Sequence, residues 1–232
     1  MDRVGQAHVA LHRWEGVRTP EERIAARYGY HVAKRAFDLV AAFLGLIVLS
    51  PLLLLVALAI VIDSRGTLNF SKKSMGYSWR TGTLRPFMFL KFRSMFEDAD
   101  SSVHQEYVRS WINGNNGNGS SNGHDKVGDL RRDKRVTRVG RVIRRTSLDE
   151  IPQLINVLRG EMSLVGPRPE LPELAAHYAP WQRRRFGVPQ GITGWWQVSG
   201  RSDRPKALHV EDDLHYIRNY SLLLDLERTV QR

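Results

Sequence analysis

Cysteine is absent from the 232 residues of the chain. Its absence excludes a disulfide framework, a thiol nucleophile and a cysteine-ligated zinc site, and it is compatible with a reducing compartment. Any bound metal must therefore have oxygen or histidine ligands. Apolar residues make up 42% of the sequence, which is enough to supply a packed core.

Acidic residues are few relative to basic ones, with 24 Asp and Glu against 35 Lys and Arg and a formal net charge of +11. Such a charge favours anionic partners, namely nucleic acid, anionic lipid or a phosphorylated substrate. The first part of the chain also lacks an apolar run and hence the pattern of a cleavable signal. We interpret residues 1–30 as a polar N-terminal extension.

The first long apolar run extends from Leu39 to Ile62, 24 residues without a charge and with a single hydroxyl. Because about 20 apolar residues cross a bilayer core as a helix, we predict a membrane helix over residues 31–65. The alternative is a buried helix of a globular protein. That alternative would need protein covering the apolar surface on every side.

Ser50 and Pro51 lie at the midpoint of this run, where proline removes a backbone N–H and is expected to bend the helix. Basic residues flank both ends of the run: Lys34, Arg35, Arg65, Lys72 and Lys73. The positive-inside bias therefore draws both ends toward the cytoplasm. A re-entrant helix-break-helix satisfies both ends, with the Ser50 hydroxyl bonding a carbonyl that the break frees. A proline-kinked single span is the alternative.

The remaining sequence alternates between structured and polar segments. Residues 83–95, TLRPFMFLKFRSM, predict a strand that leads into a basic turn. Residues 113–125 are almost wholly Asn, Gly and Ser, which indicates a flexible loop. Residues 131–147 are rich in arginine, with apolar residues at roughly helical spacing, and predict an amphipathic basic helix that can lie on anionic headgroups.

The stretch TSLDEIPQL, residues 146–154, places Asp149 beside Glu150 before a short predicted helix. The helix is marked by an apolar face and a terminating glycine: Ile151, Leu154, Ile155, Leu158 and Gly160. Ser147 and Glu150 fit a capping box, but that register carries Pro152 too far into the helix. We therefore expect the helix to start nearer Asp149. Either start puts both carboxylates at a helix N-terminus, which favours anions such as phosphate.

An ionised aspartate can attack phosphorus as a covalent nucleophile. Because carboxylate and phosphate repel each other, such a site needs cations. Glu150 together with diphosphate oxygens suits Mg²⁺. The remaining positive charge can come from basic residues in or beside turns, namely Lys91, Arg144, Arg168 and Arg201. With the apolar run, this pattern predicts phosphoryl transfer at a membrane surface.

Three motifs carry a family resemblance: KFRSM (91–95), RVTRVGRVIRRTSLDEIPQLINVLRGEMSLVGPRPEL (135–171) and GITGWWQVSGR (191–201). They resemble the bacterial sugar transferase family, the monotopic polyprenol-phosphate phosphoglycosyl transferases, over roughly residues 31–230. We therefore expect an α/β fold, mainly helical with short strands. In it, a catalytic domain of residues 66–232 with amphipathic interfacial helices sits on the re-entrant helix, at the cytoplasmic face of the bacterial inner membrane.

The resemblance implies transfer of a sugar 1-phosphate from a UDP-sugar to undecaprenyl phosphate, with Mg²⁺ and release of UMP, to initiate exopolysaccharide, O-antigen or other glycoconjugate synthesis. In the family's ping-pong route, Asp149 corresponds to the nucleophile and Glu150 to the Mg²⁺ ligand. The family's basic positions correspond to Lys91, Arg144, Arg168 and Arg201, and its helix break to Ser50 and Pro51. Anionic lipids are expected partners and nucleic acid is not; a homodimer and the identity of the sugar stay open.

Two features depart from the family pattern. In NFSKKSMGYSW, residues 69–79, Lys72 and Ser74 stand where members often carry Gln and Arg. The extra N-terminal membrane helices of the larger subgroup are not matched either, so the chain looks like the minimal catalytic form. Two rival hypotheses remain: a membrane-tethered module that binds nucleic acid or anionic lipid, motivated by the basic charge, and an enzyme in which Asp149 is a general base while both substrates are bound.

Overall fold

The computed structural model describes residues 28–78, 83–97, 133–195, 206–221 and 224–225. The fold is mixed α/β, mainly helical with short strands, as the sequence predicts. The predicted loop 113–125, Arg201 and residues 1–27 of the polar extension lie outside the described residues.

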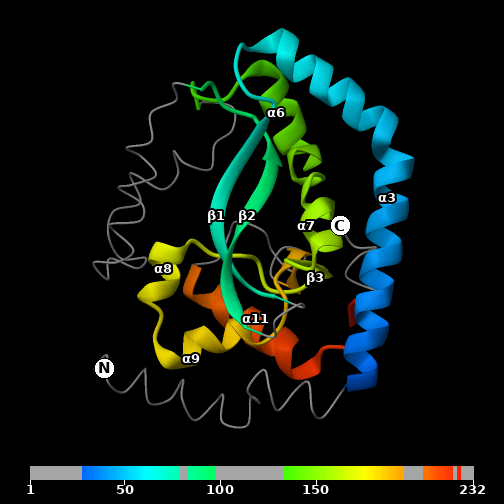
Figure 1. Ribbon diagram of the computed structural model, residues 1–232. Coiled ribbons are helices and arrows are strands. Elements are labelled where there is room, and N and C mark those ends of the chain that lie inside the picture. Colours follow the sequence, from blue (N-terminus) through cyan, green and yellow to red (C-terminus); the bar gives the residue numbers. More distant parts are fainter. Residues whose placement is uncertain (1–27, 79–82, 98–132, 196–205, 222–223, 226–232) are drawn as a thin grey trace.

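The described elements follow one another as labelled in Figure 1. The α-helices are α3 (Tyr28–Asp63), α6 (Arg138–Arg145), α7 (Gln153–Arg159), α8 (Pro172–Ala176), α9 (Pro180–Arg183) and α11 (Lys206–Asn219). The 3-10 helices are η1 (Leu148–Glu150) and η2 (Arg184–Gly187). The strands are β1 (Asn69–Tyr77), β2 (Leu84–Phe92), β3 (Ser163–Val165) and β4 (Gly191–Thr193).

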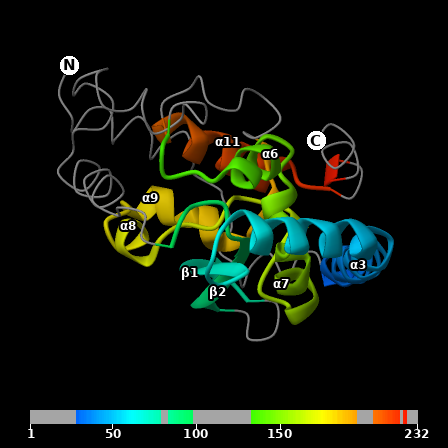
Figure 2. The same cartoon turned by 90° about the horizontal axis from the view of Figure 1, so that it is seen from above.

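Helix α3 is one continuous helix of 36 residues with Pro51 inside it. Figures 1 and 2 show that it changes direction: its first half runs beside α7, and its second half crosses the end of the body near α6. Pro51 has no N–H to offer the carbonyl of Ile47, and the Ser50 hydroxyl donates to that carbonyl instead, at 2.7 Å. The predicted hydrogen bond of Ser50 is confirmed, whereas the predicted break takes the form of a bend without loss of helix.

The outer surface of α3 is strongly apolar. Ala42, Val56 and Ile60 face the body and are buried. Much of the remaining apolar surface is exposed on Val40, Phe43, Leu44, Ile47, Val48, Leu54, Leu55, Leu58, Val61 and Ile62. By length and composition, this helix could cross a membrane. Only 11% of its most apolar stretch is buried within the described structure, which is unlike a buried helix of a globular core.

Strands β1 and β2 pair in antiparallel register along their whole length, so the strand predicted in this part of the sequence is confirmed. Side chains alternate between the two faces of a strand. Phe87 and Phe89 of β2 are buried on the face that also carries Lys91, and they pack against Ala42 of α3 and Val157 of α7. The apolar alternation of β2 thereby directs Lys91 toward the body.

The second sheet pairs β3 with β4 in parallel, with Ser163 opposite Gly191 and Val165 opposite Thr193. A Cβ on Gly191 would lie 2.1 Å from the backbone nitrogen of Gly166. The close approach of these two backbone segments therefore requires glycine at position 191. Val165 joins a buried apolar cluster formed mainly by α11. The segment that follows β3 is therefore held against the C-terminal half of the chain.

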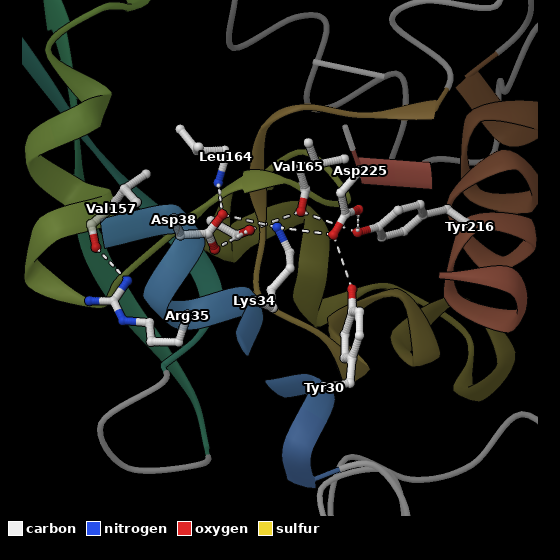
Figure 3. Close-up of polar contacts among 10 residues, drawn as sticks. Tyr30, Lys34, Arg35, Asp38, Val157, Leu164, Val165, Tyr216 and Asp225 are labelled. Carbon is white, nitrogen blue, oxygen red and sulfur yellow. Dashed lines mark hydrogen bonds and ion pairs between the residues drawn. The ribbon is translucent and has the colours of Figure 1, made fainter. Parts of the chain in front are cut away.

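A buried polar cluster lies where the first turns of α3 meet β3 and the C-terminal part of the chain (Figure 3). Lys34 Nζ lies 3.0 Å from Asp38 Oδ1 and 3.2 Å from Asp225 Oδ2, and all three side chains are buried. Asp38 Oδ2 accepts a hydrogen bond from Ser163 Oγ at 2.7 Å, and Asp225 Oδ1 accepts one from the Tyr216 hydroxyl at 2.7 Å. The cluster thus ties α3 to β3 and α11.

Arg35 points away from this cluster toward α7 (Figure 3). It donates to the carbonyl oxygens of Val157 and Leu158 at 2.7 Å and 3.2 Å. These carbonyls belong to the last turn of α7, where a helix supplies few N–H donors of its own, and the Val157 carbonyl also accepts from the Gly160 N–H at 3.0 Å. Lys34 and Arg35 therefore make contacts within the protein that the flanking-charge pattern of the sequence does not reveal.

Candidate active site

Asp149 and Glu150 lie in the 3-10 turn η1, between α6 and α7. Ser147 adopts a left-handed conformation (φ 58°), and its side chain makes no capping hydrogen bond, so the capping box that the position of Pro152 disfavoured does not form. The turn is instead closed by a backbone hydrogen bond, in which the Glu150 N–H donates to the Ser147 carbonyl at 3.1 Å. The expected helix start near Asp149 is wrong: Asp149 lies in a separate 3-10 turn, and α7 begins at Gln153, directly after Pro152.

Two basic side chains hold Glu150. Lys91 Nζ lies 3.0 Å from Glu150 Oε1, and Arg168 Nη2 donates to the same oxygen at 2.5 Å. Burial raises the pKa of the Glu150 carboxyl, but the charges and hydrogen bonds of Arg168 and Lys91 outweigh it, so the pKa lies well below its usual range. Glu150 is therefore ionised at neutral pH and oriented by two cations.

Asp149 is buried but more loosely held. Its Oδ2 lies 3.4 Å from Lys91 Nζ, and among the residues that the structure describes Lys91 is its only ion-pair partner. An ionised carboxylate can accept about four hydrogen bonds. Within the described part of the chain, the Asp149 side chain therefore keeps oxygen lone pairs that are open to a substrate, which is the property a nucleophile needs.

Arg144, in the last turn of α6, donates from Nε to Ser94 Oγ at 2.8 Å. Burial lowers the pKa of its guanidinium, and the nearby carboxylates of Asp149 and Asp133 act in the opposite direction. The positive charge of Arg144 is thus close enough to act on Asp149. Of the six predicted catalytic and substrate-binding residues, the structure describes five, namely the dyad and the three basic residues beside it, while Arg201 lies outside the described residues.

The aromatic ring of Phe89 contacts both cations that bind Glu150, namely Lys91 and Arg168. Lys91 Nζ lies 5.7 Å and Arg168 Cζ 5.8 Å from the centroid of its ring. Cations are attracted to the face of an aromatic ring at such separations, and this ring is itself buried. The ring therefore helps to fix the positions from which both cations reach Glu150.

Asn156 is a site-supporting residue that the sequence analysis missed. Its side chain is fully buried, accepts from the Leu90 N–H at 3.1 Å and donates to the Met88 carbonyl at 2.8 Å. The amide thus imitates a neighbouring strand along the open edge of β2 and pins α7 to the strand that carries Lys91. A single polar residue between the apolar positions of α7 was the only sequence signal.

The start of α6 is capped from two directions. Thr137 Oγ1 accepts from the Gly140 N–H at 2.9 Å, and Asp63 Oδ2 accepts from the Val139 N–H at 2.9 Å. Both contacts satisfy donors that a helix start leaves unpaired. Because Asp63 ends α3, the far end of the apolar helix is fastened to the helix that leads into the dyad.

The carboxylate oxygens of the dyad are of the kind that binds Mg²⁺ in proteins, where one or two carboxylates are supplemented by phosphate and water. Within the described residues no group of three or more His, Cys, Asp or Glu side chains is placed to hold a metal ion. Glu150 Oε1 is already bound by Lys91 and Arg168. The residues fit a metal that shares its coordination with a phosphorylated substrate.

A bent apolar helix, an acidic dyad and cations gathered around it define a membrane-associated protein with a site suited to phosphoryl transfer. The chain belongs to the bacterial sugar transferase family, whose model matches residues 29–231.

Several relatives of known name are similar over most of the chain. The exopolysaccharide production protein ExoY of Sinorhizobium fredii is 41% identical over 207 residues, covering 89% of this chain and 86% of that protein. The undecaprenyl-phosphate glucose phosphotransferase of Komagataeibacter xylinus is 42% identical over 208 residues, 84% of this chain and 34% of that protein. The UDP-N-acetylgalactosamine-undecaprenyl-phosphate N-acetylgalactosaminephosphotransferase of Aeromonas hydrophila is 35% identical over 204 residues, 85% of this chain and 42% of that protein. The chain therefore spans less than half the length of the last two.

Proposed function

We propose that the protein transfers a sugar 1-phosphate from a UDP-sugar to undecaprenyl phosphate, releasing UMP and initiating the synthesis of an exopolysaccharide or another glycoconjugate. Family membership and the activities named for the relatives from Komagataeibacter xylinus and Aeromonas hydrophila support this proposal. The observation that carries it is the contrast within the dyad. Glu150 is held by two cations, whereas Asp149, at its side, has only the longer contact with Lys91 among the residues that the structure describes.

In the proposed reaction, a carboxylate oxygen of Asp149 attacks the phosphorus next to the sugar. A bond forms between this oxygen and phosphorus, the bond from phosphorus to the bridging oxygen breaks, and UMP leaves with the bonding electrons. An oxygen of undecaprenyl phosphate then attacks the same phosphorus and releases Asp149. Lys91, Arg144 and Arg168 lower the repulsion between the carboxylate and the phosphates, and Arg201 is assigned to the same task from its place in the sequence.

We assign Mg²⁺ to Glu150 and the diphosphate of the donor. A bound Mg²⁺ would neutralise phosphate charge and orient the leaving group. The protein's own contribution is to keep Glu150 ionised and directed, which Lys91 and Arg168 accomplish. Replacing Glu150 by alanine should abolish most activity, and the wild-type enzyme should require added Mg²⁺. Full activity in excess chelator would contradict this assignment.

For the membrane arrangement, we propose that α3 enters the inner membrane, bends at Ser50 and Pro51, and returns to the cytoplasmic face. Both ends of α3 are fastened to the same body, Lys34 to Asp225 and Asp63 to the start of α6. A straight span would separate its ends by the hydrocarbon core, about 30 Å. Because both ends of α3 are bound to the same domain, the structure supports the re-entrant path over the kinked single span.

Helix α6 is suited to lie at the lipid headgroups. Arg138, Arg141 and Arg145 are exposed on it together with Val142, whose side chain is 61% exposed. Exposed arginines near an apolar side chain favour the boundary between anionic headgroups and acyl chains. This position would bring the dyad to the height of a lipid phosphate.

A UMP-release assay tests the proposed function. The protein in lipid nanodiscs is mixed with undecaprenyl phosphate and each member of a panel of UDP-sugars, and UMP is measured. Release with at least one UDP-sugar is expected, and the sugar that gives it identifies the substrate. Absence of UMP with every donor, together with salt-sensitive binding of DNA, would favour the nucleic-acid-binding alternative.

A further inference from the structure

Arg185, in η2, is a buried arginine outside the proposed catalytic set. Its side chain is 5% exposed, and its guanidinium contacts residues from three separate parts of the chain. A buried guanidinium is costly unless its charge and its donors are paired. The identity of its partners therefore indicates what the buried charge holds in place.

Two of the partners flank Pro169, in the loop that delivers Arg168 to the dyad. Arg185 Nη2 donates to the backbone carbonyl of Arg168 at 3.0 Å, and Nη1 lies 3.3 Å from Glu170 Oε2. The Tyr178 hydroxyl closes the arrangement, since it donates to Glu170 Oε2 at 2.7 Å and accepts from Arg185 Nη1 at 2.9 Å. One planar guanidinium thus holds the main-chain carbonyl that precedes Pro169 and the side-chain carboxylate that follows it.

A fourth partner, on α11, also binds the Arg185 guanidinium. Asp213, fully buried on α11, lies with Oδ2 2.6 Å from Arg185 Nη2. Its neighbour Leu214 packs in the same buried cluster as Val165 of β3. A continuous series of contacts therefore joins α11 to the dyad. Asp213 of α11 binds Arg185, Arg185 binds the main chain of Arg168, and the Arg168 side chain binds Glu150.

Backbone hydrogen bonds secure the rest of this loop. The Gly166 N–H donates to the Thr193 carbonyl at 2.9 Å, and the Gly191 N–H donates to the Pro167 carbonyl at 2.9 Å. Beyond Pro169, the Met75 N–H donates to the Glu170 carbonyl at 2.7 Å. The Arg168 carbonyl lies between these fixed points, and Arg185 provides its hydrogen bond.

We propose that Arg185 is a positioning residue for the transfer reaction: it holds the main chain at Arg168 so that the Arg168 guanidinium reaches Glu150. This inference rests on the proposed function of the dyad. Lysine cannot replace the arginine, because an ammonium is a point charge and cannot hold the Arg168 carbonyl and the Glu170 carboxylate in the fixed geometry of a guanidinium fork.

A double-mutant cycle tests whether Arg185 acts through Arg168. Arg185→Lys should lower kcat by roughly tenfold or more, because misplacing an orienting group by about 1 Å can cost a hundredfold. In the Arg168→Ala background, the same Arg185→Lys change should cost nothing further. Equal losses in both backgrounds would overturn the proposal. Arg93→Lys is the matched control, because this buried arginine donates to Ser64 instead, and its effect should be the same in both backgrounds.

Hydrogen–deuterium exchange provides a second test that does not depend on turnover. Arg185→Lys should accelerate exchange in peptides covering residues 163–171 while leaving peptides covering 153–160 as protected as in the wild type. Tyr178→Phe, which removes only the bridging hydroxyl, should produce a smaller change in the same place. Unchanged protection of 163–171 in the Arg185 variant would overturn the positioning role. Full activity of Arg168→Ala would contradict the function assigned to Arg168, whereas the exchange result decides separately whether Arg185 holds the main chain at that residue.

Discussion

Lys91 Nζ lies 3.0 Å from Glu150 Oε1. The lysine stands near the end of strand β2, and the glutamate belongs to the 3-10 turn η1. The same nitrogen lies 3.4 Å from Asp149 Oδ2. One ammonium therefore bridges the dyad and reduces the repulsion between two adjacent carboxylates. A phosphate that approaches Asp149 would meet this ammonium as well.

Lys91→Met should lower kcat/KM by about 10²–10³-fold, since removing one preorganised donor from a developing charge commonly costs that much. The methionine retains the apolar length of the side chain, so the fold should survive. Initial rates of UMP release measure the effect. Lys73→Met on the neighbouring strand is the control, because Lys73 is exposed and should be replaceable without loss. Equal rates for the two variants would remove Lys91 from the site.

The re-entrant path predicts that both ends of α3 are reached from the cytoplasm alone. The chain has no cysteine, so single-cysteine variants can be labelled against a blank background. Gly29→Cys and Thr67→Cys suit the two ends, because a Cβ at Gly29 meets nothing within 4 Å and Thr67 is exposed. A membrane-impermeant maleimide should label both in inverted vesicles and neither in spheroplasts.

Pro51→Leu should alter this labelling pattern. The leucine restores an N–H for the Ile47 carbonyl, so a straight helix becomes more favourable and a fraction of the Gly29→Cys end should become accessible from the periplasm. Periplasmic labelling of Gly29→Cys with the wild-type Pro51 in place would contradict the re-entrant path and favour a single span.

Asp213 should make stability depend on pH near neutrality. Burial raises its pKa to about 7, although Arg185 acts in the opposite direction. An unfolded aspartate has a pKa of about 3.9, so between the two values only the folded state holds the proton. The stability from this group is complete below the lower value and is lost as the pH rises to about 7.

Thermal unfolding in nanodiscs at about pH 5 and about pH 8 measures this loss. The melting temperature of the wild type should fall toward the higher pH, and Asp213→Asn, which cannot titrate, should fall less. Glu173→Gln, at an exposed position, should keep the wild-type difference. An identical difference in wild type and Asp213→Asn would contradict the raised pKa.

The sequence predicts those parts of the site that depend on local pattern. Alternation along β2 puts Lys91 on the face shared with buried Phe89, and the proline at the centre of the apolar run predicts the bend of α3. The course of the chain around Asp149 was less predictable. The left-handed turn at Ser147 and the late start of α7 depend on how α6 and α7 pack together, which capping rules do not include.

Long-range polar pairing is the part that pattern reasoning cannot supply. Arg185 stands in a run of three arginines that look alike in sequence, yet it alone pairs with Asp213. Lys34 likewise resembles a flanking charge of a membrane helix until Asp225, far along the chain, is placed beside it. The two members of each pair lie far apart in the sequence, and nothing in the sequence indicates that they will meet in the folded protein.

The most direct test of the proposed mechanism is a search for the covalent intermediate. The protein is incubated with each UDP-sugar and Mg²⁺ in the absence of undecaprenyl phosphate, and the intact mass is measured. The covalent mechanism predicts a mass increase of one sugar phosphate less one water, located on the peptide that contains Asp149 and missing from Asp149→Asn, which should also be inactive. An Asp149→Asn variant with wild-type turnover, or UMP release that requires lipid acceptor and leaves no adduct, would contradict it and favour a general-base role.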